Sequence, residues 1–396
     1  MVSVRSQGSR SASAAFASWL RATCAALGAR SDAFGARSGA FGATFAALGI
    51  ASAAFGVAHA ADLLITGAKP DRLFVIDAAT RTVRAEHQVA GTGGQIFTIV
   101  ISPDERTAYL LVDRMERIVG IDIAGGQEVF RADLSTPGER VKDFFAMTLT
   151  PDGRELVLYE LPTKLEPSEY VVEEPRFAVF RTNAGLNAKP VRSFPAPRRV
   201  HMLLARPSGQ SFYALGFDLY EYDLKTGKLL GTRGIQKWAL ADHSQPDLLA
   251  FWPVTEPTGV FTSPVYSEIK QAGENAPMTA LMSLNLKSGA LSYADFEPLS
   301  ALIFSTVLSP DKKHAYGVYT TLTSIDVEAH RLEKRVPLDH TFYAVNVASD
   351  GREIYLGGTN CDVGFYDALS LQKKAILKLP GCSDQTLSTL RVIHGK

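Results

Sequence analysis

The sequence predicts an all-β fold, a seven-bladed β-propeller with four-stranded antiparallel blades. A strand-like phrase of alternating apolar residues that ends in Asp or a substitute occurs seven times between residues 73 and 367. Its mean period of about 48 residues is typical of propeller blades. A second phrase, of the Ser-Pro-Asp-Gly type, keeps the same phase relative to the first. Two phrases in constant phase favour blades over the alternative, an all-β sandwich.

The first phrase is interpreted as the third strand of each blade, followed by a turn and an outer strand. Alternating β-branched and aromatic residues are typical of half-buried strands, and Asp favours the turn that follows. The seven copies are Leu73–Asp77, Ile118–Asp122, Phe177–Arg181, Leu219–Asp223, Leu281–Asn285, Thr323–Asp326 and Val363–Asp367.

The second phrase is interpreted as the turn that joins the inner strand of a blade to its second strand. It lies between two apolar runs, where Pro sets φ and Asp or Gly tolerates a positive φ. The five copies are Ser102–Asp104, Thr150–Gly153, Pro207–Gly209, Ser309–Asp311 and Ser349–Gly351.

Two units are longer than the others. The additional residues fall at 161–175 in the third unit and at 253–278 in the fifth, between the second strand and the third. Connections at that place lie on the same face of a propeller as the connections between blades. Functional residues gather on loops held by a rigid framework, so this face is predicted to carry the function.

The two ends of the repeat region predict how the ring closes. Ala61–Thr66 matches a second strand, whereas Leu387–Ile393 matches an inner strand. One blade therefore combines both ends, and pairing of the N- and C-terminal strands removes an exposed sheet edge.

Residues 1–60 do not fit the repeat. They contain five Arg and one Asp, and they end in an apolar stretch with Ala58-His59-Ala60. This pattern predicts a secretory signal cleaved before Ala61, with a start codon downstream of Met1 as an option because the basic region is long. The Arg- and Ser-rich composition also fits a mitochondrial transit peptide. The remainder, 61–396, is predicted to be a single propeller domain with a net charge of about −4, which does not favour nucleic-acid binding.

The motifs of catalytic chains are missing from the sequence. There is no Cys-x-x-Cys-His, no zinc-spaced Cys/His cluster, no glycine-rich phosphate loop and no Gly-x-Ser-x-Gly. The carboxylates recur at turn positions, where they cap their own backbone. By composition the domain is a rigid platform, and no catalytic or metal-binding residue is assigned to it.

Cys361 and Cys382 remain after removal of the signal. Cys361 precedes the last third strand and Cys382 follows the last outer strand, so both are expected on one loop face of one blade. A disulfide is therefore predicted in an oxidising compartment. The alternative is a pair of free thiols.

Several segments resemble the β subunit of bacterial quinohaemoprotein amine dehydrogenase. They occur in order over residues 61–396, and the phrase Leu134-Ser-Thr-Pro-Gly-Glu-Arg-Val-Lys142 is the most specific. The segments are Lys69–Asp77, Leu134–Lys142, Gln245–Trp252, Arg335–His340, Tyr343–Val347 and Tyr355–Gly358. The cysteine pair departs from what is expected across that family.

This resemblance implies a subunit of a periplasmic heterotrimer that oxidises primary amines to aldehydes and ammonia. In that family the α subunit carries two c-type haems, and the small γ subunit carries cysteine tryptophylquinone. The β propeller has no cofactor of its own; it holds the γ subunit and helps to wall the substrate pocket. The resemblance therefore places the catalytic base and the quinone on γ.

Aromatic and arginine side chains on the predicted functional face are the candidates for the substrate pocket or the partner interface, because such residues dominate interface energetics. Packing inside the propeller is the alternative for each aromatic residue, and a solvated rim is the alternative for each arginine. The candidates are Arg140, Arg198, Trp252, Phe261, Tyr266, His340, Phe342 and Tyr343.

Two other classes of function stay open. One is a stand-alone secreted propeller that binds a partner or ligand without catalysis. The other is a quinoprotein dehydrogenase with a soluble quinone bound in its own ring, which would need a polar cluster at the channel and Trp-rich outer strands. Only Trp238 and Trp252 remain after signal removal, which disfavours the quinoprotein class.

Overall fold

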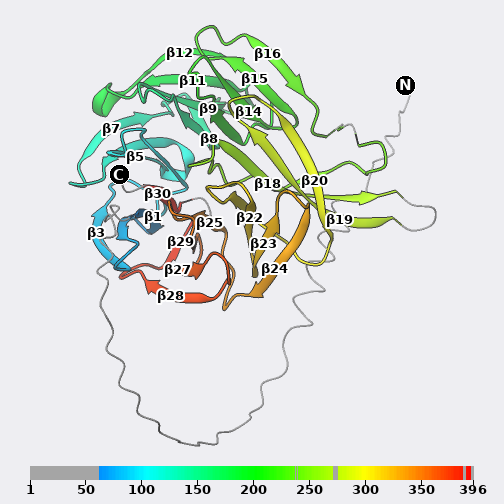
Figure 1. Cartoon of the computed structure of the whole chain (residues 1–396). Coiled ribbons are helices and arrows are strands. Elements are labelled where there is room, and N and C mark those ends of the chain that lie inside the picture. Colours follow the sequence, from blue (N-terminus) through cyan, green and yellow to red (C-terminus); the bar gives the residue numbers. More distant parts are fainter. Residues whose placement is uncertain (1–61, 237, 239, 271–274, 387–388, 394–396) are drawn as a thin grey trace, which may run out of the picture. The chain divides into compact units, whose positions relative to one another are not determined.

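Seven antiparallel sheets follow one another along the chain and close into a ring (Figure 1). This computed structural model describes residues 62–393 apart from 237, 239, 271–274 and 387–388. The predicted signal, residues 1–60, lies outside the described residues. The predictions of seven blades, of four-stranded antiparallel sheets and of a ring closed by its two ends are confirmed.

Blades 1 to 3 include the ring closure and one enlarged sheet. Blade 1 contains β30 (Arg391–Ile393), β29 (Asp384–Gln385), β1 (Leu63–Lys69), β2 (Arg72–Asp77) and β3 (Thr82–Gln88). Blade 2 contains β4 (Thr98–Ile101), β5 (Thr107–Val112), the 3₁₀ helix η1 (Asp113–Met115), β6 (Arg117–Asp122) and β7 (Glu128–Asp133). Blade 3 contains β8 (Glu139–Leu149), β9 (Glu155–Leu165), β10 (Tyr170–Val172), β11 (Arg176–Arg181), the 3₁₀ helix η2 (Gly185–Asn187) and β12 (Pro190–Pro195).

Blades 4 to 7 have four strands each. Blade 4 contains β13 (Met202–Ala205), β14 (Ser211–Leu215), β15 (Leu219–Asp223) and β16 (Leu229–Arg233). Blade 5 contains β17 (Asp247–Leu248), β18 (Val260–Ile269), β19 (Ala276–Asn285) and β20 (Leu291–Pro298). Blade 6 contains β21 (Ser305–Leu308), β22 (His314–Val318), β23 (Thr321–Asp326) and β24 (Arg331–Pro337), and blade 7 contains β25 (Ala344–Val347), β26 (Glu353–Gly357), β27 (Asp362–Asp367) and β28 (Lys373–Lys378).

The recurring Asp at the end of the third strand caps the turn that follows it. In blade 4, Asp223 Oδ1 accepts the backbone N–H of Thr226 at 2.7 Å, and Asp367 accepts that of Ser370 at 2.8 Å in blade 7. The Thr226 hydroxyl, which donates to Asp223 at 2.7 Å, together with the Thr226 N–H, holds the pKa of Asp223 below its ordinary range. The backbone N–H of Ser370 and its hydroxyl lower the pKa of Asp367 to about 2. The repeated carboxylate is therefore a structural cap, as its turn position predicted.

The turn between inner and second strands is closed by a hydroxyl–carboxylate pair. Ser102 Oγ donates to Asp104 Oδ1 at 2.5 Å and accepts the backbone N–H of Thr107 at 2.9 Å. The same arrangement recurs in blade 6, where Ser309 Oγ donates to Asp311 at 2.6 Å. This shared geometry is why the Ser-Pro-Asp phrase keeps its phase along the chain.

Blade 1 joins the two ends of the described chain. Leu63 pairs with Ile393 and Ile65 with Arg391 across the antiparallel β1–β30 pair. Of the inner strand predicted at 387–393, the structure forms a strand over the last three residues, 391–393. Residues 387–388 lie outside the described residues. Asp62, just before β1, accepts the backbone N–H of Ser349 in blade 7 at 2.9 Å, which ties the closure to the neighbouring blade.

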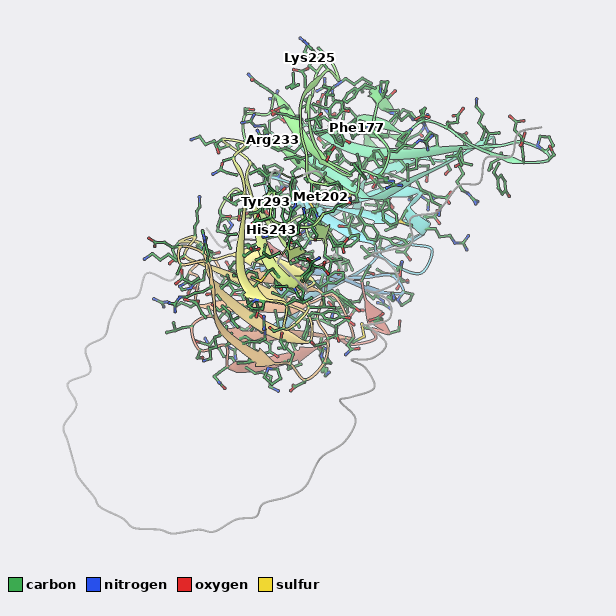
Figure 2. The ribbon with its side chains drawn as sticks, turned by 90° about the vertical axis from the view of Figure 1, so that its right-hand side faces the viewer. Phe177, Met202, Lys225, Arg233, His243 and Tyr293 are labelled. Atoms are coloured by element: carbon green, nitrogen blue, oxygen red, sulfur yellow. A yellow bond between two sulfur atoms is a disulfide. The ribbon has the colours of Figure 1, made fainter. Side chains whose placement is uncertain are left out.

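Apolar clusters between adjacent blades make up the core. Between blades 3 and 4, the ring of Phe177 lies 5.1 Å from that of Phe212 and 5.0 Å from that of Tyr222. Phe177 and Met202, labelled in Figure 2, are both fully buried. Each sheet thus buries both faces of its inner strands against its neighbours, which holds the loops of successive blades in fixed positions.

The third-unit insertion and the β18–β19 hairpin lie on the same face of the ring, as predicted. Residues 253–259 were predicted on that face too, but they precede β18, the second strand of blade 5, and lie at the opposite face, because the additional residues fall partly before the second strand. The chain begins each inner strand on the face of the third-unit insertion, called here the upper face, and reaches the Ser-Pro-Asp turns on the opposite, lower face. The β9–β11 connection, which contains β10, and the β18–β19 hairpin both extend from the upper face. The β9–β10 region projects well beyond the other blades (Figure 2).

Candidate functional site at the upper mouth of the channel

One backbone position on the upper face is aromatic in four blades. It is the residue just before the inner strand, and its N–H donates to a carbonyl oxygen near the end of the neighbouring second strand at 2.7–3.1 Å. The four residues are Phe97, His201, Phe304 and Tyr343. Each is half-buried, whereas the residue before it is buried in the core. The repeat therefore places aromatic rings at equivalent points around the upper mouth.

Five rings on blades 4 to 7 form a continuous group, called here the aromatic crescent and defined by His201, Phe251, Phe304, Tyr319 and Tyr343. The centre of the Phe304 ring lies 4.6 Å from that of Tyr343 and 6.2 Å from that of Tyr319. Phe251 lies 6.0 Å from Phe304 and 6.0 Å from His201. Successive rings at these separations are in favourable aromatic contact.

A β-bulge adds aromatic residues on the opposite part of the mouth. Pairing of β8 with β9 is interrupted between Asp143 and Met147. Phe145, inside the bulge, has a φ of 65° and contacts Phe97 with ring centres 6.1 Å apart. Phe144 is 43% exposed. Bulges redirect side chains that a regular strand would bury, and here the bulge presents Phe144 on the upper face.

A buried carboxylic acid supports this bulge. Asp143 is fully buried, and its Oδ1 accepts the backbone N–H of Ala146 at 2.7 Å. Burial raises the pKa of Asp143 to about 8, with a further contribution from the nearby Glu160. Asp143 is therefore largely protonated at neutral pH, and its neutral form avoids an unpaired buried charge.

The crescent combines apolar ring faces with a few polar groups. Burial lowers the pKa of His201, so its imidazole is neutral at pH 7. Tyr319 and Tyr343 add phenolic hydroxyl groups. An uncharged surface of half-buried rings is suited to packing against an apolar or aromatic group and to orienting it by hydrogen bonds. The same composition is typical of the energetically dominant centre of a protein interface.

The channel below the crescent is crossed by a buried pair. The Arg391 guanidinium, from blade 1, lies over the Trp252 ring of blade 5 at 4.6 Å from its centre. Trp252 Nε1 donates to Val345 O at 2.8 Å in blade 7, and Arg391 donates to Thr98 in blade 2. Burial lowers the pKa of Arg391 to about 10, which leaves it charged at neutral pH. This pair links four blades around the axis.

A cavity of about 480 Å³ opens at the lower end of the inner strands. Its lining includes Arg391 and Asn346 together with the carboxylates Glu105 and Glu256. Because the cavity holds charges of both signs, it does not define a simple anion or cation site. This cavity lies at the opposite end of the inner strands from the aromatic crescent.

A histidine between two carboxylates lies on the segment that precedes β17 in blade 5. His243 is buried, with Nδ1 2.8 Å from Asp242 and Nε2 2.8 Å from Asp295. Hydrogen bonds to the two Asp residues raise its pKa despite the opposing effect of burial. Trp238 packs edge-on between His243 and Tyr293, both visible in Figure 2. This cluster fastens the segment that precedes β17.

Four of the aromatic residues predicted at the interface are buried in the core, and that assignment is corrected here. Trp252, Phe261, Tyr266 and Phe342 are at most 6% exposed. Tyr266 shows the reason: its hydroxyl donates to Ile303 O and accepts Ile303 N–H, both at 2.7 Å, which joins blade 5 to blade 6. Packing between blades, the alternative interpretation, accounts for all four.

The other four candidates are accessible on the upper face. Tyr343 belongs to the crescent. His340 lies 3.1 Å from the buried carboxylate of Asp362 and packs on Phe342 with ring centres 4.1 Å apart. Arg140 and Arg198 have side chains that are 54% and 55% exposed and form ion pairs with Glu116 and Glu174, respectively. The structure does not bring Arg140 or Arg198 into the crescent.

Cys361 and Cys382 form a disulfide with their Cα atoms 5.6 Å apart. It joins the β26–β27 loop to the segment after β28, both on the upper face of blade 7. The disulfide lies beside Asp362, which also accepts Lys378 Nζ at 2.7 Å. These links fix the loop that carries His340.

Sequence reasoning missed most of the crescent, namely Phe251, Phe304 and Tyr319. The signal that could have found it is the aromatic residue directly before each inner strand. Alignment of the units on their Ser-Pro-Asp turns places Phe97, Phe304 and Tyr343 in one column. The contact of Phe251 with these rings depends on the irregular course of blade 5 after β17.

The comparisons with known proteins show the fold. The chain is similar to Kuenenia stuttgartiensis hydrazine synthase at 16% identity and a TM-score of 0.51, with 78% of this chain and 90% of the other covered. It is also similar to a functionally unknown protein from Desulfotomaculum acetoxidans DSM 771 at 8% identity and a TM-score of 0.56, with 84% and 99% covered. A third structure, the dihydro-haem d1 dehydrogenase NirN, aligns at 14% identity and a TM-score of 0.48 over 82% and 74% of the two chains.

No protein-family model matches the chain, and no curated protein sequence matches it. At these identities the structural similarity defines the class of protein, a seven-bladed β-propeller, and nothing finer. Within the described residues, no helix is long and apolar enough to cross a membrane.

Proposed function

We propose that this chain is the β subunit of a periplasmic quinohaemoprotein amine dehydrogenase. In this role it holds the quinone-bearing γ subunit on its upper face and forms part of the wall of the amine-binding pocket. The chemistry, oxidation of a primary amine to an aldehyde and ammonia, belongs to the assembled complex with the dihaem α subunit. No residue of this chain is assigned to a chemical step.

The observation that carries the proposal is the ordered set of segments that resemble this family over residues 61–396. Three of them gather on the upper face. Leu134–Lys142 forms the turn into β8, Gln245–Trp252 leads into the channel in blade 5, and Arg335–His340 leads to the inner strand of blade 7. The other three, Lys69–Asp77, Tyr343–Val347 and Tyr355–Gly358, lie in or beside strands of blades 1 and 7, so the resemblance includes both the upper face and the framework of the blades.

The most specific of these segments has a defined local structure. Ser135 Oγ accepts the backbone N–H of Val141 at 2.9 Å and donates to Glu116 at 2.9 Å. Arg140 and Lys142 reach the same Glu116 at 3.3 and 3.6 Å. A carboxylate that holds three polar groups is a positioning element, and it fixes the loop next to the bulge that presents Phe144.

The aromatic crescent supports the pocket-forming part of the proposal. An amine with an apolar substituent requires a dry, apolar wall, and a rigid ring face supplies it at a low entropic cost. Tyr343 and Phe304 are half-buried in this chain and are available to a partner that covers the mouth. The crossing of the channel by Arg391 and Trp252 would close the pocket from below.

The proposal is tested by affinity purification of the chain, tagged at its carboxyl end, from the periplasm of its own host grown on an amine. Co-purification of a c-type haem protein and a small quinone-bearing chain, with haem reduction on addition of amine, supports it. A colourless monomer with the mass of the mature chain contradicts it and favours a stand-alone binding propeller. A Leu369→Ala chain, altered at an 88%-exposed position on the lower face, is the matched control.

A further inference from the structure

The arm of blade 3, defined as residues 161–175, is the most prominent projection of the described chain (Figure 2). We propose that the arm is a docking element for a basic partner subunit, which adds a strand to the open edge of β10. The proposal rests on the proposed function in taking this partner to be a member of the assembled complex. It concerns a surface separate from the aromatic crescent.

β10 is an edge strand. It pairs with β9 on one side, and no strand of the described chain pairs with its other side. Glu173 N–H donates to Pro162 O at 3.0 Å, so the backbone groups of Glu173, and two residues before it those of Val171, point toward β9. Since antiparallel pairing uses every second residue, the backbone groups of Tyr170 and Val172 point to the open side.

The side chains of this edge are apolar and exposed. Tyr170 is 74% exposed, Val171 39% and Val172 64%. An open edge with consecutive apolar residues is prone to unwanted pairing, and proteins usually cover it. The three residues together combine unpaired backbone groups with apolar surface, which is the combination used in recognition by strand addition.

The charge around the edge defines the partner. Glu166, Glu169, Glu173 and Glu174 lie within ten positions of one another, and the arm contains one basic residue, Lys164. Lys164 pairs with Glu173 at 2.6 Å, and Arg198 pairs with Glu174 at 2.8 Å. Within the described chain no ion pair reaches Glu166 or Glu169. The net negative charge favours a partner strand flanked by Lys or Arg.

Pairing of two copies of β10 about its central residue is unfavourable. Antiparallel pairing of two β10 strands about Val171 would place Glu169 of one copy opposite Glu173 of the other. Like charges directly opposite one another destabilise a strand pair. In this register the charge pattern therefore favours a different protein, one with the opposite charge.

The base of the arm is held rigidly. Arg176 donates to Glu160 at 2.6 Å and to both carboxylate oxygens of Glu139 at 3.2 and 3.3 Å. Glu160 is buried, and desolvation by burial raises its pKa. A strand that is already ordered before it meets its partner loses less conformational entropy on binding. The arm thus has the pre-organisation that a docking element requires.

The first step of the test maps the partner. The full chain, with Tyr170 replaced by the photo-crosslinking residue p-benzoylphenylalanine, is expressed in its own host and irradiated. A chain with the same residue at Leu369 on the lower face serves as the control. Crosslinks from position 170, and not from 369, into a Lys- or Arg-rich segment of a co-purifying subunit support the proposal. Crosslinks only to a second copy of this chain, or only within the chain, overturn it.

The second step tests strand addition. The partner subunits released from the native complex by salt are rebound to the full chain carrying Val172→Pro or Val172→Ala. Both variants lose the valine side chain, but only proline removes the N–H that faces the open edge. We expect at least tenfold weaker binding for Val172→Pro than for Val172→Ala, with unchanged thermal unfolding of the isolated chains. Equal binding of the two variants overturns strand addition.

The third step tests the charge. Glu166→Lys together with Glu169→Lys is expected to slow association by about tenfold at low salt, and the difference should shrink as salt rises. No change in association overturns the charge argument.

Failure of the proposed function is distinguishable from failure of docking. A crosslinked basic partner without haem or quinone would contradict the proposed dehydrogenase function but support docking at the arm. An intact dehydrogenase in which every arm variant still binds the partner would contradict docking at the arm and leave the proposed function unaffected.

Discussion

Arg391 and Trp252 meet in the channel from blades that are not neighbours. The guanidinium of Arg391 lies 4.6 Å from the centre of the Trp252 ring, and no carboxylate of the described chain lies within ion-pair distance of it. Trp252 in turn donates to Val345 O at 2.8 Å. A buried cation held by the Trp252 ring face, the Leu390 carbonyl oxygen and the Thr98 hydroxyl links the ring closure in blade 1 to blades 2, 5 and 7.

Trp252→Ala is expected to reduce the free energy of unfolding by about 3–5 kcal/mol, because it removes a fully packed aromatic side chain. Arg391→Met should reduce the free energy of unfolding by less than Trp252→Ala does, because it also removes the desolvation penalty of a buried charge. Urea unfolding of both single variants and the double variant should give a coupling of about 1–2 kcal/mol. Arg352→Met, at an exposed arginine, is the control. Strict additivity would show that the stacking contributes nothing.

Loss of the disulfide is expected to destabilise blade 7. The bond closes a loop between residues 21 positions apart, for which chain entropy predicts about 3 kcal/mol. Cys361→Ser together with Cys382→Ser should therefore lower the Tm of the chain. A reductant should lower the Tm of the unaltered chain to a similar value and leave the double variant unchanged. An effect of reductant on the double variant would contradict this assignment.

Asp143 is expected to make the chain less stable as pH rises from about 4 to about 8. Its folded-state pKa is raised from 3.8 to about 8, so over this window the folded state keeps a proton that the unfolded state has released. Asp143→Asn cannot titrate, so its stability relative to the unaltered chain should increase with pH across the same window. Denaturant unfolding at pH 5, 6.5 and 8 measures the difference. Parallel pH profiles would show that Asp143 is ionised in the folded chain.

The contribution of His243 to the stability of the chain is expected to fall as pH rises, which is the opposite of the effect of a buried neutral histidine. Its folded-state pKa is raised by Asp295 and Asp242, so the stabilisation is fully present below the ordinary value of 6.5 and is lost as pH rises through the raised pKa. Trp238, 5.6 Å from His243, should report this titration by fluorescence. His243→Gln should abolish the titration, while a persistent transition would assign it to another group.

Tyr343→Ala is expected to change KM or kcat for the amine in the assembled complex, because Tyr343 lies in the crescent that would wall the pocket. Tyr343→Phe, which keeps the ring, should have the smaller effect. Steady-state kinetics of the purified complexes, with Leu369→Ala as the control, provide the measurement. Unchanged kinetics in a fully assembled Tyr343→Ala complex would remove this residue from the pocket.

The blade pattern could be predicted because its signals are local. Asp223 caps the turn three residues ahead, and Ser102 binds the Asp two residues ahead, so each interaction lies within one short segment. The upper face could be predicted as well, since the order of strands in a blade determines on which face each connection falls. The insertion at 161–175 and the β18–β19 hairpin follow from the same rule, whereas residues 253–259 precede β18 and lie at the lower face.

The candidate site could be predicted only in part. Phe342 and Tyr343 are adjacent aromatic residues on the same loop, but Phe342 is buried and Tyr343 is half-buried. Successive residues at the start of a strand point to opposite sides, so the register of β25 against β26 decides between them. Phe261 and Tyr266 were assigned to an insertion, whereas the structure includes both in the regular part of β18.

The sequence by itself determined the number of blades, the order of their strands and the turns, because these depend on repeated short-range hydrogen bonds and backbone preferences. It also determined the pairing of the chain ends, because each end matches one part of a single repeat. Only the tertiary structure decided which aromatic rings gather at the upper mouth, how Arg391 reaches Trp252, and that β10 is left with an open edge. These features arise when seven units of unequal length close into one ring. The relative positions of distant segments then depend on packing between blades, which no single repeat encodes.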